Sequence, residues 1–438
     1  MFWGFMDFIP NTKQQQDEML KFIGVSSVND LFKDIPNEIL LKNNLNLGKG
    51  LSELELKKKL SNLASKNKTN FISFLGAGSY NHFIPSIVNH IISRSEFYTA
   101  YTPYQPEISQ GMLQAIYEYQ TMIADLTGMD VANASMYDGA SALAEACIMA
   151  ASITKRNEIL ILNSVHPEYR QVVKTYCKAH SFNLIEIEEK DIGNRVTENT
   201  AALLIQNPDF FGCLHNLDEI ENLVHENNAL LVVSTIEITS LGLLKSPGSL
   251  GADIFVGEGQ SLGNAMNFGG PYLGIIATKE KHKRNIPGRI VGRTVDVEGK
   301  PGFILTLQAR EQHIRREKAC SNICSNEALC ALAATVHLSA LGKQGIKDLA
   351  ELNFHKAHYL AEKLKENDFE VWDKLFYNEF VVKVEDAQKV SDKLLKNNIL
   401  GGLDLGQFYP KLKNCLLFCV TEVITKKEMD KLVEVLKS

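Results

Sequence analysis

Between residues 158 and 278 the chain alternates short apolar runs with segments of helical periodicity, and this alternation restricts the fold most. The apolar runs occupy residues 158–164, 183–189, 201–207, 229–235, 252–258 and 271–278. Runs that are short and apolar on both faces are typical of a mostly parallel sheet that helices cover on both sides. The sequence therefore predicts an α/β fold, with ligands at the loops beyond the carboxyl ends of the strands.

The flanking segments predict two further parts of the chain. Residues 1–70 read as a helical N-terminal extension, in which Ser52 and Glu55 form a capping box. Residues 71–330 form the predicted large α/β domain. A long Ala/Leu-rich helix then leads into a smaller α+β domain over residues 331–438. The predicted strands of that domain lie at residues 369–373, 380–384 and 415–423.

Composition and charge exclude several classes of partner. The chain has 438 residues and a formal net charge of −6, which favours neither nucleic acid nor an anionic membrane surface. No apolar run reaches the roughly 18–20 residues that span a bilayer. The eight cysteines include no Cys-x-x-Cys pair, so reduced thiols in the cytoplasm are expected and a metal site is not. The apolar residues 1–10 lack the features of a secretory signal and are interpreted as a docking tail, or as residues upstream of a start at Met6.

The segment FYTAYTPYQPEISQG, residues 97–111, has an unusual composition for a connector. It holds Tyr98, Tyr101 and Tyr104 with two prolines and several polar side chains, but no lysine or arginine. Proline stiffens the path, and tyrosine offers a large contact area with a polar tip. The segment is interpreted either as a rigid strap that presents polar groups to a site or as a packed connector. An amphipathic helix capped by a glycine is expected to follow it, over residues 111–127.

Two other features suit ligand binding, and each has a structural alternative. Arg310, Arg315 and Arg316 lie close together in the sequence and could bind a carboxylate, or could cover a solvated helix face. His166 follows a predicted strand and could stack on a planar ligand, or could be a loop residue with internal hydrogen bonds.

Several motifs resemble the P-protein family of the glycine cleavage system, in particular its alpha-subunit branch. Residues 98–111 and 126–146 match that family nearly residue for residue. The further matching segments are residues 7–12, 74–91, 307–326 and 401–410. The resemblance covers essentially the whole chain from Met6 onward, and a near-identity rich in tyrosine, proline and glutamine is very specific.

The resemblance implies the aspartate-aminotransferase-like fold of pyridoxal-phosphate enzymes, fold type I. A site of this kind needs a lysine for the Schiff base, an acid on the pyridinium nitrogen and a phosphate cradle. By the resemblance, Ser234 stands at the position of the acid, with Glu237 as the nearest carboxylate. Gln260 and Ser261 stand where the related subunit has His-Lys, and residues 246–278 contain no lysine. A hydroxyl or an amide cannot form an imine, so covalent attachment of the cofactor is not expected here.

The phosphate cradle alone has a candidate in this chain. Asp138, Gly139 and Ser141 are expected at the start of a helix, where backbone N–H groups can hold a phosphate. The alternative is that these residues only cap the helix.

The resemblance also implies a division of labour between two subunits. The beta subunit binds pyridoxal phosphate covalently, and the alpha subunit completes the shared site in an assembly expected to be α2β2. The pair decarboxylates glycine and transfers the aminomethyl group to the lipoyl arm of the H-protein. The residues expected to reach the shared cleft are Tyr98, Tyr101, Thr102, Tyr104, Gln105, Glu107, Ser109 and Gln110. Residues 76–79 are expected to form a tight turn beside them.

Two other functions are left open by the sequence. One is a self-sufficient pyridoxal-phosphate lyase or aminotransferase that uses Lys245. The other is a purely structural subunit without active-site residues, which the polar and tyrosine-rich strap argues against.

Overall fold

A computed structural model describes residues 10–41, 43, 45–323 and 325–438, and it divides into two compact units. The first unit is Met1–Thr69 and the second is Asn70–Ser438. Residues 1–9 of the predicted tail, half of the matching segment 7–12, and Cys324 lie outside the described residues. The predicted boundary near residue 330 lies inside the second unit and stays a prediction.

The first unit consists of short helices that are held mainly by their caps. They are α1 (Lys13–Ile23), a 3₁₀ turn (Val28–Phe32) and α2 (Glu53–Ala64). The predicted capping box is confirmed: Ser52 N–H donates to Glu55 Oε2 at 2.8 Å, and Glu55 N–H donates to Ser52 Oγ at 3.3 Å. Leu20 is a buried residue of α1, whereas α2 buries none.

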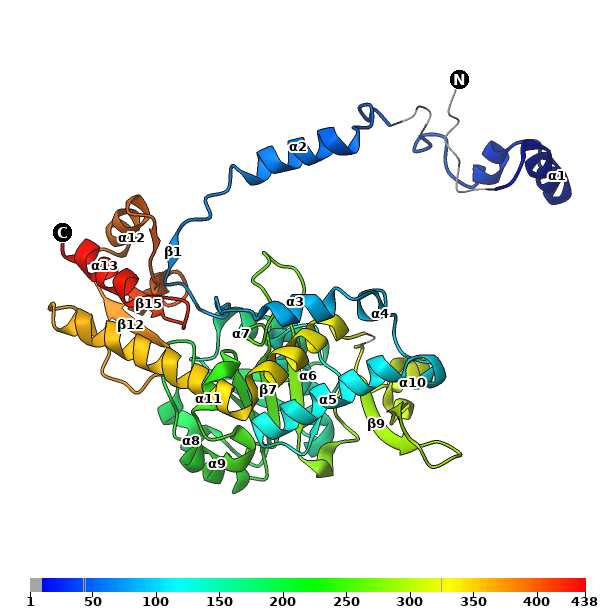
Figure 1. The fold of residues 1–438 in the computed structure, drawn as a ribbon. Coiled ribbons are helices and arrows are strands. Elements are labelled where there is room, and N and C mark those ends of the chain that lie inside the picture. The colour runs from blue at the N-terminus through cyan, green and yellow to red at the C-terminus, as the bar shows by residue number, and fades with distance from the viewer. Residues whose placement is uncertain (1–9, 42, 44, 324) are drawn as a thin grey trace. The chain divides into compact units, whose positions relative to one another are not determined.

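All six apolar runs form strands of one seven-stranded sheet in the second unit (Figure 1). The strands are β2 (Val131–Ala132), β3 (Glu158–Leu162), β4 (Asn183–Ile187), β5 (Thr200–Gln206), β6 (Leu230–Thr235), β7 (Ile254–Glu258) and β8 (Gly274–Thr278). Their order is β2-β8-β7-β6-β5-β3-β4. Strands β3 to β7 are parallel, and β8 is antiparallel to both β7 and β2. The prediction of a mostly parallel sheet is therefore confirmed.

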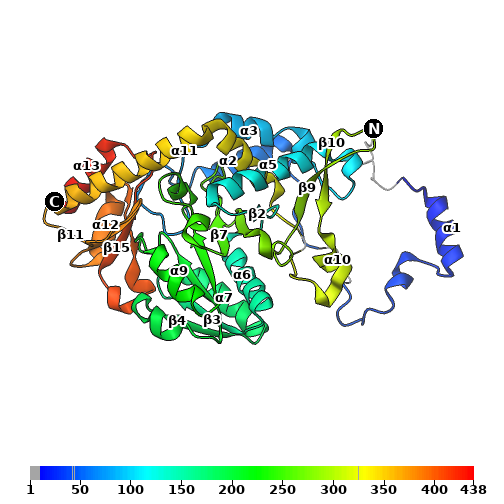
Figure 2. The same cartoon turned by 90° about the horizontal axis from the view of Figure 1, so that it is seen from below.

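Helices lie on both sides of this sheet (Figure 2). The main ones are α5 (Gln110–Thr127), α6 (Gly139–Thr154), α7 (Pro167–Ala179), α9 (Leu217–His225) and α11 (Ala328–Lys365). In Figure 2, α5 and α11 lie above β7, and α6 and α7 lie below it. The predicted helix cap at Gly128 is confirmed, since this residue has φ 68° at the end of α5. We call the seven-stranded sheet together with the helices on its two sides the large lobe.

A four-stranded antiparallel sheet follows α11, which is kinked at Gly342. Its strands are β11 (Glu370–Val371), β12 (Glu379–Lys383), β14 (Leu403–Asp404) and β15 (Cys415–Cys419), in the order β11-β12-β15-β14. Together with α12 (Ala387–Lys396) and α13 (Lys426–Lys437) it forms what we call the C-terminal lobe. It has its own hydrophobic cluster, into which Phe74 inserts from the start of the second unit. All three predicted strand segments form strands here.

One hairpin is not among the predicted strands. Strands β9 (Ile290–Val295) and β10 (Pro301–Thr306) pair antiparallel to each other outside the main sheet. Their sequences are interrupted by glycine, arginine and proline, and β9 is exposed over its second half, so no continuous apolar run marks them. None of the helices in the described part of the chain has the length and apolar composition needed to cross a bilayer.

Candidate functional site

Gln260 and Ser261 follow β7 at the carboxyl end of the sheet, and both are buried at 2% exposure. The Gln260 amide accepts a hydrogen bond from Tyr80 N–H at 2.9 Å and donates to Tyr80 O at 3.0 Å and Asn264 O at 2.8 Å. Ser261 Oγ donates to Glu237 Oε2 at 3.0 Å. At the position where the resemblance expects a lysine in the partner, this chain has two side chains that are committed to internal hydrogen bonds.

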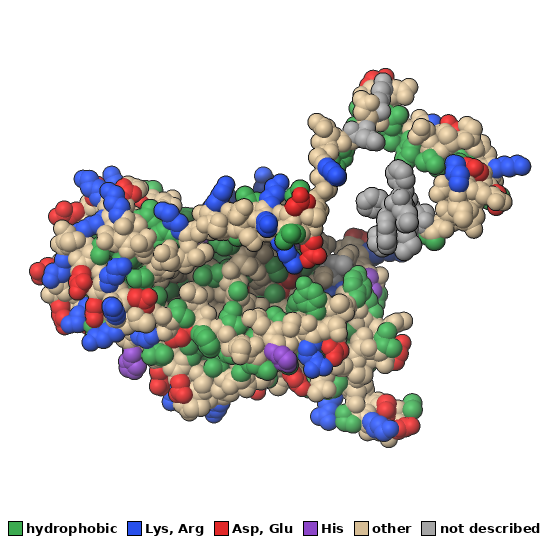
Figure 3. Space-filling view, turned by 45° about the horizontal axis from the view of Figure 1, so that its top comes forward, with side chains coloured by type: hydrophobic (Ala, Val, Ile, Leu, Met, Phe, Trp, Pro, Cys, Tyr) green, Lys and Arg blue, Asp and Glu red, His purple; other side chains and the backbone are tan. Residues whose placement is uncertain are grey.

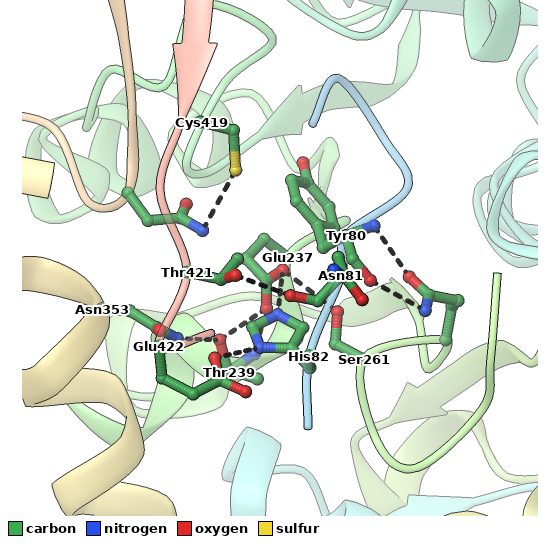
Figure 4. Close-up of polar contacts among 12 residues, drawn as sticks. Tyr80, Asn81, His82, Glu237, Thr239, Ser261, Asn353, Cys419, Thr421 and Glu422 are labelled. Atoms are coloured by element: carbon green, nitrogen blue, oxygen red, sulfur yellow. Dashed lines mark hydrogen bonds and ion pairs between the residues drawn. The ribbon is translucent and has the colours of Figure 1, made fainter. Parts of the chain in front are cut away.

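The Glu237 carboxylate also belongs to a buried ion triad that joins the two lobes (Figure 4). His82 Nε2 lies 3.0 Å from Glu237 Oε2, and His82 Nδ1 lies 2.7 Å from Glu422 Oε2. Burial lowers the pKa of His82, but the two carboxylates outweigh it and raise that pKa to about 10. The ring is therefore an imidazolium at neutral pH, and it links the end of β6 to the loop after β15.

The second oxygen of Glu237 is satisfied as well. Glu237 Oε1 accepts hydrogen bonds from Thr239 N–H at 3.0 Å and from Thr239 Oγ1 at 2.5 Å. Ser234, at the acid position implied by the resemblance, is fully buried, and its hydroxyl has no partner among the described residues. Neither side chain is a free acid. Serine carries no acidic group, and the Glu237 carboxylate accepts hydrogen bonds from His82, Ser261 and Thr239.

Residues 76–79 form the predicted tight turn, with φ 55° at Ala77 and 105° at Gly78. Ala77 O accepts a hydrogen bond from His166 Nε2 at 2.8 Å, and a Cβ on Gly78 would lie 3.0 Å from the same nitrogen. Burial lowers the pKa of His166, so the ring is neutral. This chain's own turn, together with Tyr169 and Phe210, packs around the His166 ring, an arrangement that favours the loop residue with internal hydrogen bonds over a ring that stacks on a ligand.

The same turn is fixed from the C-terminal lobe by Glu379. Its Oε1 accepts from Ala77 N–H at 2.6 Å, and its Oε2 accepts from Tyr80 Oη at 2.8 Å. A Cβ on Gly76 would lie 2.5 Å from Glu379 Oε1, so only glycine fits at that position. Burial raises the pKa of Glu379 to about 7.

At the candidate phosphate cradle at the start of α6, two carboxylates of this chain accept hydrogen bonds from the backbone N–H groups. Asp138 Oδ1 accepts from Ser141 N–H at 2.8 Å, which confirms the predicted helix cap. Glu258 Oε2 accepts from Gly139 N–H at 2.9 Å. Glu258 Oε1 accepts from Gln260 N–H at 3.1 Å and from Leu273 N–H at 2.9 Å.

These residues do not fit a pyridoxal-phosphate site. No amine stands at the position that the resemblance implies for the Schiff base, no free acid stands at the position it implies for the acid, and carboxylates hold the donors of the candidate cradle. Lys245 is exposed on the loop after a 3₁₀ turn (Ile238–Gly242), whereas Ser261 is buried. Within the described residues no group of three or more His, Cys, Asp or Glu side chains could hold a metal ion.

The strap, Tyr98–Gln110, lies mostly at the surface. The exposed fractions of Tyr98, Tyr101 and Tyr104 are 68%, 86% and 47%. Gln105 and Glu107 are exposed, and Thr102 and Ser109 are half-buried. A pocket of about 730 Å³ is lined by the strap residues Tyr101, Thr102, Tyr104, Gln105, Ile108 and Ser109, together with residues from its two flanks.

Two anchors fix the strap to the β9–β10 region. Gln110 pairs with the backbone of Phe303, donating to its carbonyl and accepting from its N–H at 2.9 Å each. Arg289 Nη2 donates to Tyr104 Oη at 2.8 Å, with the guanidinium carbon 5.2 Å from the tyrosine ring centre. Arg289 is only 5% exposed, and its Nε and Nη1 have no partner among the described residues.

The three arginines of the basic segment have different surroundings. Arg310 donates to the backbone carbonyls of Ile286 and Gly288, and burial lowers its pKa. Arg315 is exposed and donates to Ala309 O at 3.0 Å. Arg316 is exposed and lines a pocket of about 410 Å³. The three guanidinium groups therefore do not share one internal set of partners.

Sequence reasoning missed His82, Glu258, Glu379 and Glu422. Glu258 alone has a sequence signal, because it is a carboxylate at the end of an otherwise apolar and buried strand. The others are paired with residues far along the chain, such as His82 with Glu422, 340 positions away. Nothing in the local pattern marks them.

Comparison with known proteins identifies the family. The family model described as glycine cleavage system P-protein matches residues 6–436. A probable glycine dehydrogenase (decarboxylating) subunit 1 of Desulfitobacterium hafniense is 54% identical, over 98% of each chain. The crystal structure of a glycine decarboxylase (P-protein) of the glycine cleavage system, in inhibitor-bound form, is similar with a TM-score of 0.89 and 43% identity, over 99% of each chain.

A more distant structure shows how widely the fold is shared. The glutamate decarboxylase of Lactobacillus brevis is only 10% identical but has a TM-score of 0.68, over 94% of this chain and 96% of that one. The fold is that of the type I pyridoxal-phosphate enzymes, as expected. The chain belongs to the glycine cleavage system P-protein family.

Proposed function

We propose that this chain is the alpha subunit of a glycine dehydrogenase (decarboxylating) and completes an active site whose cofactor is bound by a beta subunit. The assembly decarboxylates glycine and transfers the aminomethyl group to the lipoyl arm of the H-protein. The partner supplies the lysine and the pyridoxal phosphate, and the cofactor provides the electron sink. The observation that carries the proposal is the contrast between a lysine position filled by Gln260 and Ser261 and a polar strap left at the surface.

The strap supports a shared cleft because most of its polar and aromatic side chains are exposed in this chain. Tyrosines that expose most of their surface contribute little to stability, whereas they supply large contact areas at interfaces. The buried Arg289 behind Tyr104 adds a positive charge with donors left over. We propose that the residues at the cleft are those predicted from the sequence, Tyr98 to Gln110, and that Arg316 is the arginine available for anion contact.

Exposed apolar side chains in the strap and in the segment before it support a large interface with the partner. Phe83, Ile87 and Ile108 are 67%, 43% and 77% exposed. In Figure 3, charged side chains gather over the end that carries α12 and α13, while hydrophobic side chains are frequent over the middle of the face. We propose an obligate complex, α2β2, with an interface of roughly 2,000 Å² or more.

The seven described cysteines are free thiols, which supports the cytoplasm as the location.

The proposal is tested by reconstitution with a beta chain that carries His-Lys before a glycine-rich turn. The alpha chain alone should be colourless and should gain no pyridoxyl group when borohydride is added with the cofactor. The mixed chains should elute as one complex, absorb as an internal aldimine and catalyse glycine–bicarbonate exchange. Separate elution of the two chains at micromolar concentration would contradict the shared site.

A further inference from the structure

We propose that the N-terminus of α6 in this chain is an anion-binding site whose ligand is the chain's own Glu258 carboxylate. Glu258 thereby excludes phosphate esters from the large lobe. The inference goes beyond the proposed function, which concerns attachment of the cofactor in the partner. It concerns this chain alone and survives if the shared cleft is wrong.

The first argument is the set of donors around Glu258. Three backbone N–H groups converge on its two oxygens, at distances of 2.9, 3.1 and 2.9 Å. They come from three segments: the start of α6, the loop after β7 and the residue before β8. Converging backbone donors at a helix N-terminus form the arrangement that holds anions in proteins. Here the anion is a side chain.

The second argument is burial. Glu258 is 2% exposed, and an unpaired carboxylate at that depth would cost several kcal/mol. Among the described residues no lysine or arginine hydrogen-bonds it; the donors found there are all backbone N–H groups. The helix dipole of α6, which is 16 residues long, adds a favourable potential at Gly139. The backbone therefore acts as the counter-charge for this carboxylate.

The third argument is space. A Cβ on Gly139 would lie 2.5 Å from Tyr169 Oη, and a Cβ on Gly274 would lie 2.4 Å from Asp138 O. The backbone at these two glycines, on either side of the carboxylate's donors, is therefore closely packed. A phosphate monoester carries up to two negative charges, needs the same N–H donors and would be repelled by Glu258. Glu258 and a phosphate ester cannot occupy the site together.

The charge state of Glu258 sets the conditions of the test. Burial raises the pKa of Glu258 to about 7, although the three backbone hydrogen bonds act in the opposite direction. Measurements at pH 8 therefore keep the carboxylate ionised.

The experiment compares the full wild-type chain with Glu258→Ala and Glu258→Gln. Each protein is refolded and dialysed at pH 8 with inorganic phosphate or phenyl phosphate, and phenol serves as the control that lacks the phosphate. Glu258→Ala should bind both phosphates at least 10-fold more tightly than wild type and should not respond to phenol. Glu258→Gln fills the same space and should gain no binding.

A second measurement keeps the proposal falsifiable if Glu258→Ala does not fold. In ¹⁵N-labelled wild-type chain the amide protons of Gly139 and Leu273 should resonate downfield and titrate together with a pKa near that of Glu258. Both shifts should move upfield in Glu258→Gln. A folded Glu258→Ala that binds no phosphate after refolding in its presence would overturn the proposal. Amide shifts that are unchanged in Glu258→Gln would overturn it too.

Discussion

The strap and the buried cleft around Ser261 both contain polar residues. They differ in whether those polar groups are hydrogen-bonded within the chain or exposed at its surface. In the cleft, Glu237 and Glu379 have donors on both oxygens within the chain. In the strap, Gln105 and Glu107 lie at the surface. A buried polar group that lacks its partner costs about 1–3 kcal/mol, so the buried polar groups of the cleft must pair with one another. Polar groups at a surface have no such constraint and remain available to a partner.

The largest expected effect is on the buried side of this comparison. His82→Ala would leave the buried Glu237 and the partly buried Glu422 without their shared cation, and the free energy of unfolding should fall by about 3–5 kcal/mol. Urea unfolding of the alpha chain measures this loss. The exposed His355→Ala in α11 is the matched control and should change stability by less than about 0.5 kcal/mol. Equal effects of the two substitutions would show that the triad does not hold the lobes together.

The next effect is a dependence of stability on pH. The pKa of Glu379 is about 7 in the folded chain against 4.5 as its ordinary value. Between these values the folded chain holds a proton that the unfolded chain has released. The stability from this group is therefore present at low pH and lost as the pH rises through 7, at up to about 1.4 kcal/mol per pH unit.

Glu379→Gln removes that titration. The difference in unfolding free energy between wild type and the variant should change steadily from pH 5 to pH 7 and level off above it. Urea unfolding at half-unit steps of pH measures the difference. A difference that is constant across this range would mean that Glu379 is ionised throughout, and that the cleft is more polar than its burial indicates.

A smaller effect in energy, but the decisive one for function, is expected in the strap. Gln105→Ala and Glu107→Ala should leave the melting temperature and the yield of complex unchanged. Glycine–bicarbonate exchange should fall 10-fold or more, which corresponds to about 1.4 kcal/mol of transition-state stabilisation. Lys66→Ala, at an exposed position of the first unit, is the control without effect. If exchange instead follows the yield of complex across the series, the strap is a packed connector.

The smallest effect is expected at Lys245. This side chain is exposed, whereas Ser261 is buried, so Lys245→Met should change neither exchange activity nor stability measurably. Peptide mapping after borohydride reduction with pyridoxal phosphate should find no pyridoxyl group on it. A specific, stoichiometric adduct at Lys245 would support the alternative of a self-sufficient enzyme.

Much of the fold could be predicted because its signals are local. Strands β3, β5, β6, β7 and β8 are buried on both faces and therefore read as continuous apolar runs. The caps at Ser52, Gly128 and Asp138 are defined by residues within a few positions of one another. The hairpin β9–β10 was missed because it lies outside the main sheet and its pattern is broken by glycine, arginine and proline.

The sequence by itself determined the family, the mostly parallel sheet, and the lack of a lysine between Lys245 and Lys279, since each of these depends on residue identity or local pattern. Only the tertiary structure decided which groups pair with one another in the buried cleft. His82 meets Glu422 across 340 positions, and Tyr80 meets Glu379 across 299. The physical reason is that a buried charge requires a partner near in space and not near in sequence, and the burial itself exists only once the two lobes have packed together.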